Sequence, residues 1–293
     1  MRTGSQVAAW SAVRILVSND DGIYSPGIAA LAKAAAEFGD VRIVAPDVEQ
    51  SSMGHAITAS RPLSYRRTKV NGFEAFRVNG TPADCVALGC HNWERVDVVL
   101  SGVNLGLNLG NSIWHSGTLA AAKQATLLGR RGIALSAPGS EDFDGNALAP
   151  WIHRVLEAVM PDPSLTLLNV NFPRAPRGLT WTRVSVRRYD GRVAPMQDPM
   201  GRPVYWFTVV PLEGSEEGTD RWALERGWIS LTPLRLDLTD EAALARARER
   251  HPLDDEAAAR LPPREPRTEA ARTVREDEAD TAVPAAAGPE SNG

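Results

Sequence analysis

Two adjacent carboxylates follow a short apolar segment near the start of the chain. Val13–Val17 is typical of a buried parallel strand, and the turn Ser18–Gly22 after it carries Asp20 and Asp21. Two neighbouring carboxylates repel each other unless a proton or a cation lies between them, so a hard divalent metal ion is their natural partner. In the alternative interpretation the aspartates only form an Asx turn, with Gly22 at positive φ. Taken alone, the motif favours this plain turn.

Two further polar loops are expected at the same edge of the sheet. The hydroxyl groups of the loop 46–55 could bind a metal or a substrate, and the loop 101–118 places Asn104, a neutral oxygen ligand, just after a strand. Glycine recurs at every fourth position in the loop 101–118, so the backbone of this loop can approach a ligand closely. Ligands of open α/β sheets bind outside the carboxyl ends of the strands, and we therefore expect the three loops to converge.

A helix start supplies a second kind of site. Ser116, Gly117 and Thr118 precede the apolar run LAAAKQATLL, and free N–H groups at a helix start bind phosphate well. Simple N-capping would need one hydroxyl but neither the glycine nor the second hydroxyl. A metal site and an anion site on one edge together indicate metal-assisted chemistry on a phosphate ester.

Strands and helices alternate through the first 178 residues, which predicts a doubly wound, Rossmann-like α/β fold with a mostly parallel sheet. The turn 18–22 lacks the Gly-x-Gly-x-x-Gly motif, which argues against dinucleotide binding. The stretch 51–80 is interpreted as irregular. Further strands are expected at 41–45, 96–102, 133–136 and 167–171. Helices are expected at 26–38 (capped by Ser25 and closed by Gly39), 82–89, 119–128 (opened by Ser116-Gly117-Thr118 and closed by Gly129) and 146–160.

From about residue 180 the pattern changes to strands and turns without intervening helices. The segments 182–189, 204–209 and 228–231 predict a β-rich lobe that contains many of the large aromatic residues. These aromatic side chains serve either subunit contacts or packing against the main sheet. We divide the chain into a leader (1–12), a domain whose candidate site residues indicate chemistry on a phosphate ester (13–240, with an α/β core at 13–178 and a β-rich lobe at 179–240) and a tail (241–293).

Charge and composition exclude several classes of protein. The chain has 293 residues and a net charge of −4, which argues against broad binding of nucleic acid or anionic membranes. The tail contains 12 acidic and 8 basic residues and so holds the whole imbalance. One helix is expected at 241–251, and the composition beyond 262 predicts disorder. The N-terminal stretch is too weakly apolar for a secretory signal, which favours a cytoplasmic location. Cys85 and Cys90 are expected to be small apolar residues of a helix.

Several motifs together resemble the SurE family, the stationary-phase survival proteins. The resemblance covers about 14–240. Its motifs are Ile15–Ile23 with Ser25-Pro26-Gly27, Ala45-Pro46-Asp47 with Gln50-Ser51, Gly80–Val86, Ser101–Asn104 with Gly106 and Asn108–Gly110, Ser116–Thr118 with Ala120–Ala122, Asn169–Asn171 with Pro173, Asp198-Pro199 with Gly201, Gly218-Thr219-Asp220, and Ser230–Leu234.

The resemblance implies a metal-dependent 5′-nucleotidase that hydrolyses nucleoside 5′-monophosphates and acts as a homodimer or homotetramer with exchanged C-terminal β segments. It implies one divalent ion per subunit, Mg²⁺ or Mn²⁺. The metal ligands would be Asp20, Asp21, Ser51 and Asn104, the first two also being catalytic, and the phosphate-binding residues Asn108, Ser116, Gly117 and Thr118. His115 stands where many relatives carry Tyr, and it binds phosphate, acts as an acid or only packs.

Other functions remain open at this point. A broader phosphatase acting on 3′-nucleotides or polyphosphate, and a non-catalytic nucleotide sensor, would carry the same motifs. Neither the preferred base, nor the metal, nor the choice between direct water attack and a phosphoenzyme follows from the sequence.

Overall fold

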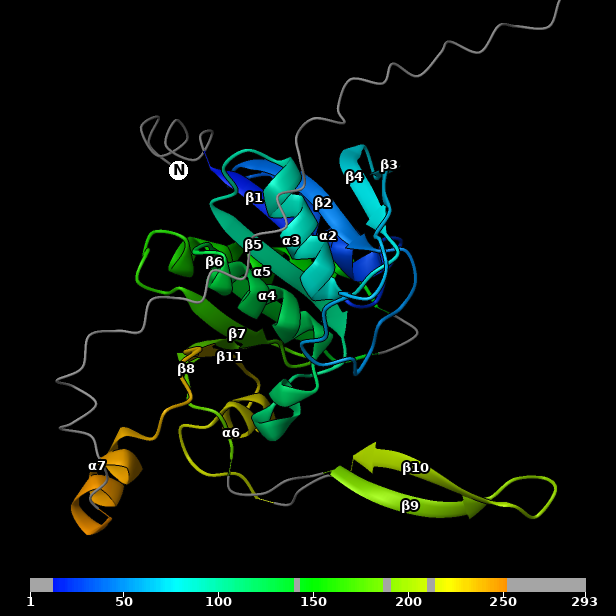
Figure 1. Cartoon of the computed structure of the whole chain (residues 1–293). Coiled ribbons are helices and arrows are strands. Elements are labelled where there is room, and N and C mark those ends of the chain that lie inside the picture. The colour runs from blue at the N-terminus through cyan, green and yellow to red at the C-terminus, as the bar shows by residue number, and fades with distance from the viewer. Residues whose placement is uncertain (1–12, 140–142, 187–190, 210–213, 252–293) are drawn as a thin grey trace, which may run out of the picture. The chain divides into compact units, whose positions relative to one another are not determined.

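A mixed β-sheet forms the centre of the chain (Figure 1). The computed structural model describes residues 13–139, 143–186, 191–209 and 214–251. Within these ranges, nine strands form one sheet in the order β3-β4-β2-β1-β5-β6-β7-β11-β8. The strands are β1 (Arg14–Ser18), β2 (Asp40–Pro46), β3 (Tyr65–Val70), β4 (Phe73–Val78), β5 (Val98–Leu105), β6 (Arg131–Ala137), β7 (Leu167–Asn171), β8 (Gly178–Trp181) and β11 (Trp228–Pro233). The six from β4 to β7 in this order pair in parallel, which confirms the predicted mostly parallel α/β fold.

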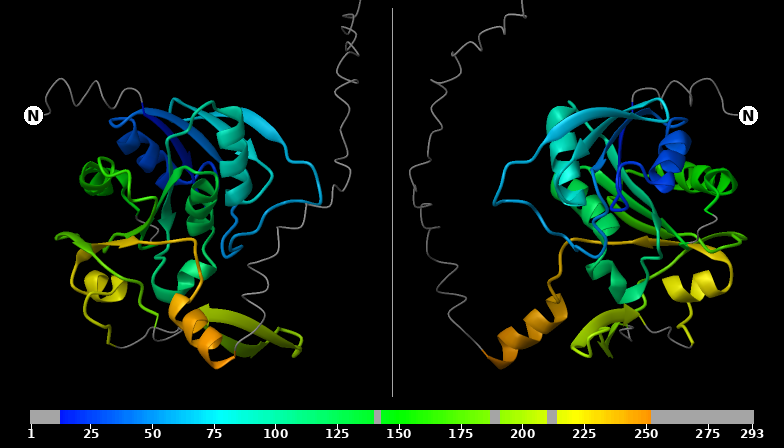
Figure 2. Two further views of the ribbon diagram at one scale, coloured as in Figure 1. Left: turned by 60° about the vertical axis from the view of Figure 1, so that its left-hand side comes forward. Right: turned by 90° about the vertical axis from the view of Figure 1, so that its right-hand side faces the viewer.

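Helices cover both faces of the sheet (Figure 2). α2 (Pro26–Ala35) and α5 (Gly145–Val159) pack together on one face, and α3 (Pro82–Asn92) and α4 (Gly117–Leu127) pack together on the other. Each pair closes a separate apolar core against the sheet. Burial on both faces explains why the central strands are continuous apolar runs rather than alternating ones.

The strand order reverses between β1 and β5. The chain passes from β1 outward through α2 to β2, and returns through α3 to β5 on the other side of β1. The loops that follow these two neighbouring strands therefore leave the carboxyl edge in opposite directions and open a crevice between them, which is where open α/β sheets bind ligands.

Most of the predicted helix boundaries are confirmed, with one error. Ser25 caps α2, and its hydroxyl accepts a hydrogen bond from the N–H of Ile28; Gly129, just beyond α4, has a φ of +71°. The predicted C-terminal cap at Gly39 is wrong, because α2 ends at Ala35. A glycine is needed there for a different reason: a Cβ on Gly39 would lie 2.2 Å from the carbonyl oxygen of Val13.

The stretch 51–80, interpreted as irregular, contains the hairpin of β3 and β4. β3 has the sequence YRRTKV and lies at the edge of the sheet, where charged side chains reach solvent. Its turn is Asn71-Gly72, and both residues have positive φ (48° and 89°). Asn-Gly is the strongest short-range hairpin signal, so the sequence carried this information.

The C-terminal lobe of antiparallel strands consists of β9 (Gly191–Gln197) and β10 (Pro203–Val209), a separate two-stranded sheet. Two segments assigned to the lobe behave differently: β8 and β11 extend the main sheet beyond β7. The expected absence of helices is also wrong, because α6 (Asp220–Glu225) precedes β11. The strand expected at 182–189 is not formed over 182–186, and the rest of it lies outside the described residues.

Residues 239–251 belong to a second unit of the chain. They contain α7 (Glu241–Arg250), which confirms the helix expected at 241–251 and buries none of its residues. The leader 1–12 and the predicted disorder beyond 262 lie outside the described residues. Among the helices that the structure describes, none has the length and apolar character needed to cross a membrane.

Candidate metal and phosphate site

The three polar loops converge on one cavity of about 680 Å³ at the carboxyl edge of the sheet. It lies at the reversal of strand order between β1 and β5. The predicted residues that line it are Asp20, Asp21, Ser51, Asn104, Asn108 and Ser116. Gly117 and Thr118 follow Ser116 in the buried first turn of α4. The structure thus brings all the predicted site residues into one place.

Asp20 is buried against the start of α4. The hydroxyl of Thr118 donates a 2.7 Å hydrogen bond to its Oδ1 atom. Burial raises the pKa of Asp20 to about 6; the hydrogen bond from Thr118 opposes this shift and the charge of Asp21 adds to it. Gly117 makes the close approach possible, because a Cβ there would lie 2.8 Å from the Cβ of Asp20 and 2.9 Å from its Oδ2.

The other proposed ligands present oxygen atoms. Asp21 accepts a 3.2 Å hydrogen bond from the N–H of Leu105. Burial, the larger cause, and the nearby charge of Glu49 raise the pKa of Asp21, while this hydrogen bond opposes the rise. The amide nitrogen of Asn104 donates to the carbonyl of Gly106 (2.6 Å), which leaves the amide oxygen for a ligand. The Ser51 hydroxyl donates to Glu49 Oε1 (2.7 Å), and its lone pairs remain.

These donors fit a hard divalent cation. Within the described ranges, no three His, Cys, Asp or Glu side chains form a metal-binding cluster, so an ion here needs the neutral amide and hydroxyl oxygens as well. The set of two carboxylates, an amide and a hydroxyl is all oxygen, as Mg²⁺ and Mn²⁺ prefer. Moreover, no Lys or Arg occurs among the described residues that line the cavity, so Asp20 and Asp21 face no Lys or Arg side chain there.

Some polar groups at the start of α4 form hydrogen bonds within the protein, and others are left for a ligand. The hydroxyl of Ser116 caps the helix by accepting a 3.1 Å hydrogen bond from the N–H of Leu119. The hydroxyl of Thr118 donates its hydrogen bond to Asp20. The N–H of Gly117, the first residue of the helix, and the hydroxyl hydrogen of Ser116 are left for an anion.

Asn108 is held tightly at the edge of the cavity. Its amide nitrogen donates to Ser136 Oγ (2.8 Å) and, more weakly, to Thr118 Oγ1 (3.3 Å). Its backbone is held by two fully buried asparagines of β7: Asn171 accepts from its N–H (2.8 Å), and both Asn169 and Asn171 donate to its carbonyl (2.9 and 3.0 Å). Sequence reasoning missed these two supports, although two asparagines in a buried strand are an unusual polar signal.

The aromatic side of the cavity comes from two distant segments. His115 lines it directly before α4, and Phe207 of β10 lines it from the hairpin, with 6.1 Å between the ring centroids and a 67° angle between the rings. Sequence reasoning did not include Phe207. No local pattern indicates that Phe207 lines the cavity, because this depends on the position of the β9–β10 hairpin relative to the α/β core.

The fold and the cavity define a class: a doubly wound α/β protein with an acidic, oxygen-rich site at the reversal of strand order. Comparison with known proteins narrows this class. The family model "Survival protein SurE" matches residues 15–191. A protein of Thermus thermophilus named 5′-nucleotidase SurE 1 is 50% identical over 234 residues, which is 78% of this chain and 93% of that protein.

Two further comparisons agree. The 5′-nucleotidase SurE of Deinococcus radiodurans is 48% identical over 236 residues, covering 77% of this chain and 88% of that protein. The crystal structure of the SurE protein from Aquifex aeolicus matches with a TM-score of 0.70 and 39% identity, covering 80% of this chain and 98% of that one. The chain belongs to the SurE family.

Proposed function

We propose that this chain is a metal-dependent 5′-nucleotidase, which hydrolyses nucleoside 5′-monophosphates to nucleoside and phosphate. One observation carries the proposal: the buried Asp20 and the half-buried Asp21 line the cavity without Lys or Arg among its described lining residues. A doubly charged phosphate ester entering this site adds to the negative charge. A bound divalent cation would neutralise the two carboxylates and make the site attractive to the substrate, and the family to which the chain belongs is metal-dependent.

Asp20, Asp21, Asn104 and Ser51 are the proposed ligands of one divalent ion, Mg²⁺ or Mn²⁺. When bound, such an ion polarises the phosphate and lowers the pKa of a coordinated water. Thr118 and the N–H of Leu105 orient the two carboxylates through the hydrogen bonds described above. Hydrogen bonds of this kind fix the direction of the ligand oxygens and so tune the affinity of the site for the ion.

The phosphate oxygens would meet the hydroxyl of Ser116 and the N–H of Gly117, with the helix dipole favouring their charge. Thr118, the third residue expected to bind phosphate, bonds to Asp20 through its hydroxyl and its backbone N–H, and it would act by holding that carboxylate. Asn108 would share with a phosphate oxygen the N–H that makes its longer, 3.3 Å bond to Thr118. The cavity is larger than one phosphate group requires, which leaves space for a nucleoside beside Leu107, His115 and Phe207.

The assembly and location of the protein remain part of the proposal. We propose a homodimer or homotetramer formed through the β9–β10 hairpin, because Tyr205, Trp206 and Phe207 expose 69, 63 and 63% of their surface. A cytoplasmic location is the prediction of the N-terminal sequence.

The test is phosphate release from all nucleoside monophosphates after treatment with EDTA and return of individual metals. We expect turnover of 5′-monophosphates with Mg²⁺ or Mn²⁺ and none without metal.

Asp20→Asn and Asp21→Asn should each lower turnover by more than about a hundredfold, since even indirect supports of a metal ligand are worth tenfold to a hundredfold. Full turnover in both variants would refute the site. Preference for 3′-nucleotides or polyphosphate would favour a broader phosphatase, and binding without hydrolysis with every metal would favour a sensor.

A further inference from the structure

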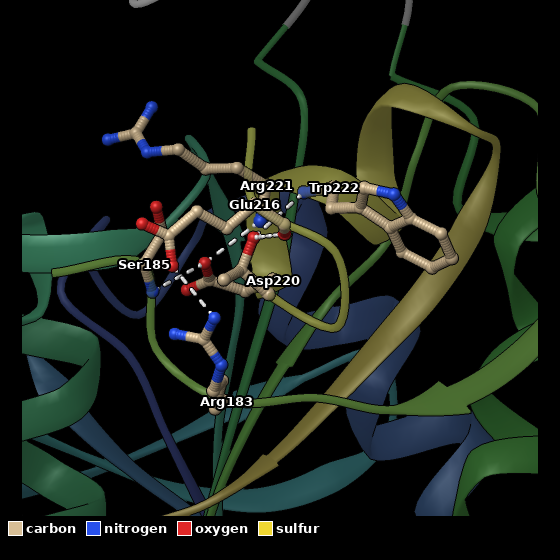
Figure 3. A network of polar contacts seen from close by, with 7 residues as sticks. Arg183, Ser185, Glu216, Asp220, Arg221 and Trp222 are labelled. Carbon is tan, nitrogen blue, oxygen red and sulfur yellow. Dashed lines mark hydrogen bonds and ion pairs between the residues drawn. The ribbon is translucent and has the colours of Figure 1, made fainter. Parts of the chain in front are cut away.

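A second buried carboxylate lies outside the cavity and belongs to neither the proposed metal site nor the phosphate site. Asp220, the first residue of α6, is fully buried. Figure 3 shows its carboxylate within a network of polar contacts. Burial raises the pKa of Asp220, while hydrogen bonds from three backbone N–H groups oppose that rise. It ends the motif Gly218-Thr219-Asp220, to which the proposed reaction gives no role.

The two oxygens of Asp220 join three separate segments of the chain. Oδ2 accepts from the N–H of Gly110 (2.8 Å). Oδ1 accepts from the N–H of Ser185 (3.0 Å) and of Arg221 (2.8 Å). The contact with Gly110 is the one that reaches the site, because Gly110 ends the loop 106–110 that follows β5 and carries Asn108.

This contact is close as well as polar. A Cβ on Gly110 would lie 2.5 Å from the carbonyl oxygen of Ser185, so the loop can dock here only with glycine, which also takes a φ of +56°. The loop is also held at Asn108, two residues before Gly110. The side chain of Asn171 accepts from the N–H of Asn108 and donates to the carbonyl of Asn108. The loop is therefore held at two points, one on β7 and one at Asp220.

From the loop, hydrogen bonds continue to the proposed metal ligand. The amide nitrogen of Asn108 donates to Thr118 Oγ1 (3.3 Å), and that hydroxyl donates to Asp20 Oδ1 (2.7 Å). We propose that Asp220 is a positioning residue of this site: through Gly110 it fixes the loop 106–110, and with it the placement of Asn108 and Thr118 beside Asp20. The inference rests on the proposed nucleotidase function.

One substitution isolates the contact with Gly110. In Asp220→Asn the amide oxygen can keep the bonds from Ser185 and Arg221, but the amide nitrogen then faces the N–H of Gly110, and two donors cannot bond. The matched control is Arg183→Gln. This substitution removes the exposed 2.7 Å ion pair between Arg183 and Glu216 (Figure 3). Like the bond from Ser185 to Asp220, the ion pair joins the segment around 183–185 to the segment around 216–220, but it does not involve Gly110.

Two measurements test the proposal. The first is hydrogen–deuterium exchange of the amides of 105–112: we expect faster exchange in Asp220→Asn and wild-type exchange in Arg183→Gln. The second is steady-state kinetics with the metal present. We expect Asp220→Asn to lower kcat/KM by about tenfold or more, the worth of a hydrogen bond to a charged group, and to weaken competitive inhibition by inorganic phosphate similarly. Its unfolding midpoint should change little, because the neutral amide also removes a buried charge.

Several results would overturn the proposal. Unchanged exchange at 105–112 in Asp220→Asn would remove the link to the loop, and this readout does not depend on any activity of the wild-type chain. An equal loss of kcat/KM in Arg183→Gln, or a lower unfolding midpoint with unchanged kcat/KM in Asp220→Asn, would make Asp220 only structural. If Asp220→Asn does not fold, Gly110→Ala displaces the same contact from the other side and should give the same kinetic change.

Discussion

At the scale of the residue, Gly117 is a point where local structure and chemistry compete. It is the first residue of α4, where alanine would suit the helix better by up to about 1 kcal/mol. A methyl group there would displace Asp20, whose carboxyl lies within 3 Å of the position of that Cβ. We therefore expect Gly117→Ala to weaken metal binding and kcat/KM by about tenfold or more while leaving the unfolding midpoint unchanged or slightly raised.

Calorimetric titration with Mn²⁺, beside thermal unfolding, measures both effects. The matched control is Leu127→Ala at the other end of the same helix, where the side chain is 60% exposed. Wild-type metal affinity in Gly117→Ala would show that Asp20 does not need its present position.

The same scale shows what local sequence can predict about a site. Asp20, Asp21 and Ser116 were identifiable because each follows a strand or starts a helix, and Asn104 because it lies near the carboxyl end of β5. Such positions meet at one edge of a parallel sheet. Their supports were not identifiable in this way. Asn171 and Asp220 act on residues 63 and 110 positions away, and nothing in their own neighbourhoods specifies those partners.

At the scale of the element, α3 depends on a reciprocal cap. The hydroxyl of Thr81 accepts from the N–H of Asp84, and the Asp84 carboxylate accepts from the N–H groups of Thr81 (2.9 Å) and Thr58 (3.0 Å). Burial alone would raise the pKa of Asp84, but these hydrogen bonds outweigh it and lower the pKa below 3.8. The cap thus fixes the loop 51–58 to the helix start as well as closing the helix.

A folded-state pKa below the unfolded value means that the Asp84 carboxylate stabilises the fold above the unfolded value, and that this contribution is lost as the pH falls through the folded value. We expect Asp84→Asn to lower the free energy of unfolding by about 1–3 kcal/mol at neutral pH. The difference from wild type should shrink as the pH falls below 3.8. Urea unfolding across this range measures it, with Asp40→Asn at an exposed position as control. A difference that does not vary with pH would contradict the role of the charge.

Elements were predictable to the degree that their own residues determined them. Caps such as Ser25 and Ser116 gave correct helix starts because the capping bond is local. The strand β11 was assigned to the lobe because strand propensity does not say which sheet a strand joins; that depends on its pairing with β7. The strand β8, which pairs with β11, was not predicted, because the sequence pattern placed a strand at 182–189 instead. The β3–β4 hairpin was missed although Asn71-Gly72 marked its turn.

At the scale of the whole molecule, the β9–β10 hairpin is the feature that the fold of one chain does not explain. Side chains alternate across a strand, so Tyr205 and Phe207 lie on one face of this two-stranded sheet and Trp206 on the other. All three are largely exposed. An isolated hairpin is only marginally stable in water, and large aromatic side chains exposed on both of its faces are the mark of a contact surface.

We therefore expect the double variant Tyr205→Ser/Trp206→Ser to dissociate to monomers at concentrations where the wild type forms the proposed dimer or tetramer, as measured by analytical ultracentrifugation. Phe207 is left in place because it lines the cavity, so metal binding by the monomer should remain within about threefold of wild type, the size of an indirect effect below 1 kcal/mol. Met200→Ser, at the turn of the same hairpin and 77% exposed, is the matched control and should keep the wild-type assembly. An unchanged sedimentation coefficient in the double variant would place the subunit contact elsewhere on the molecule.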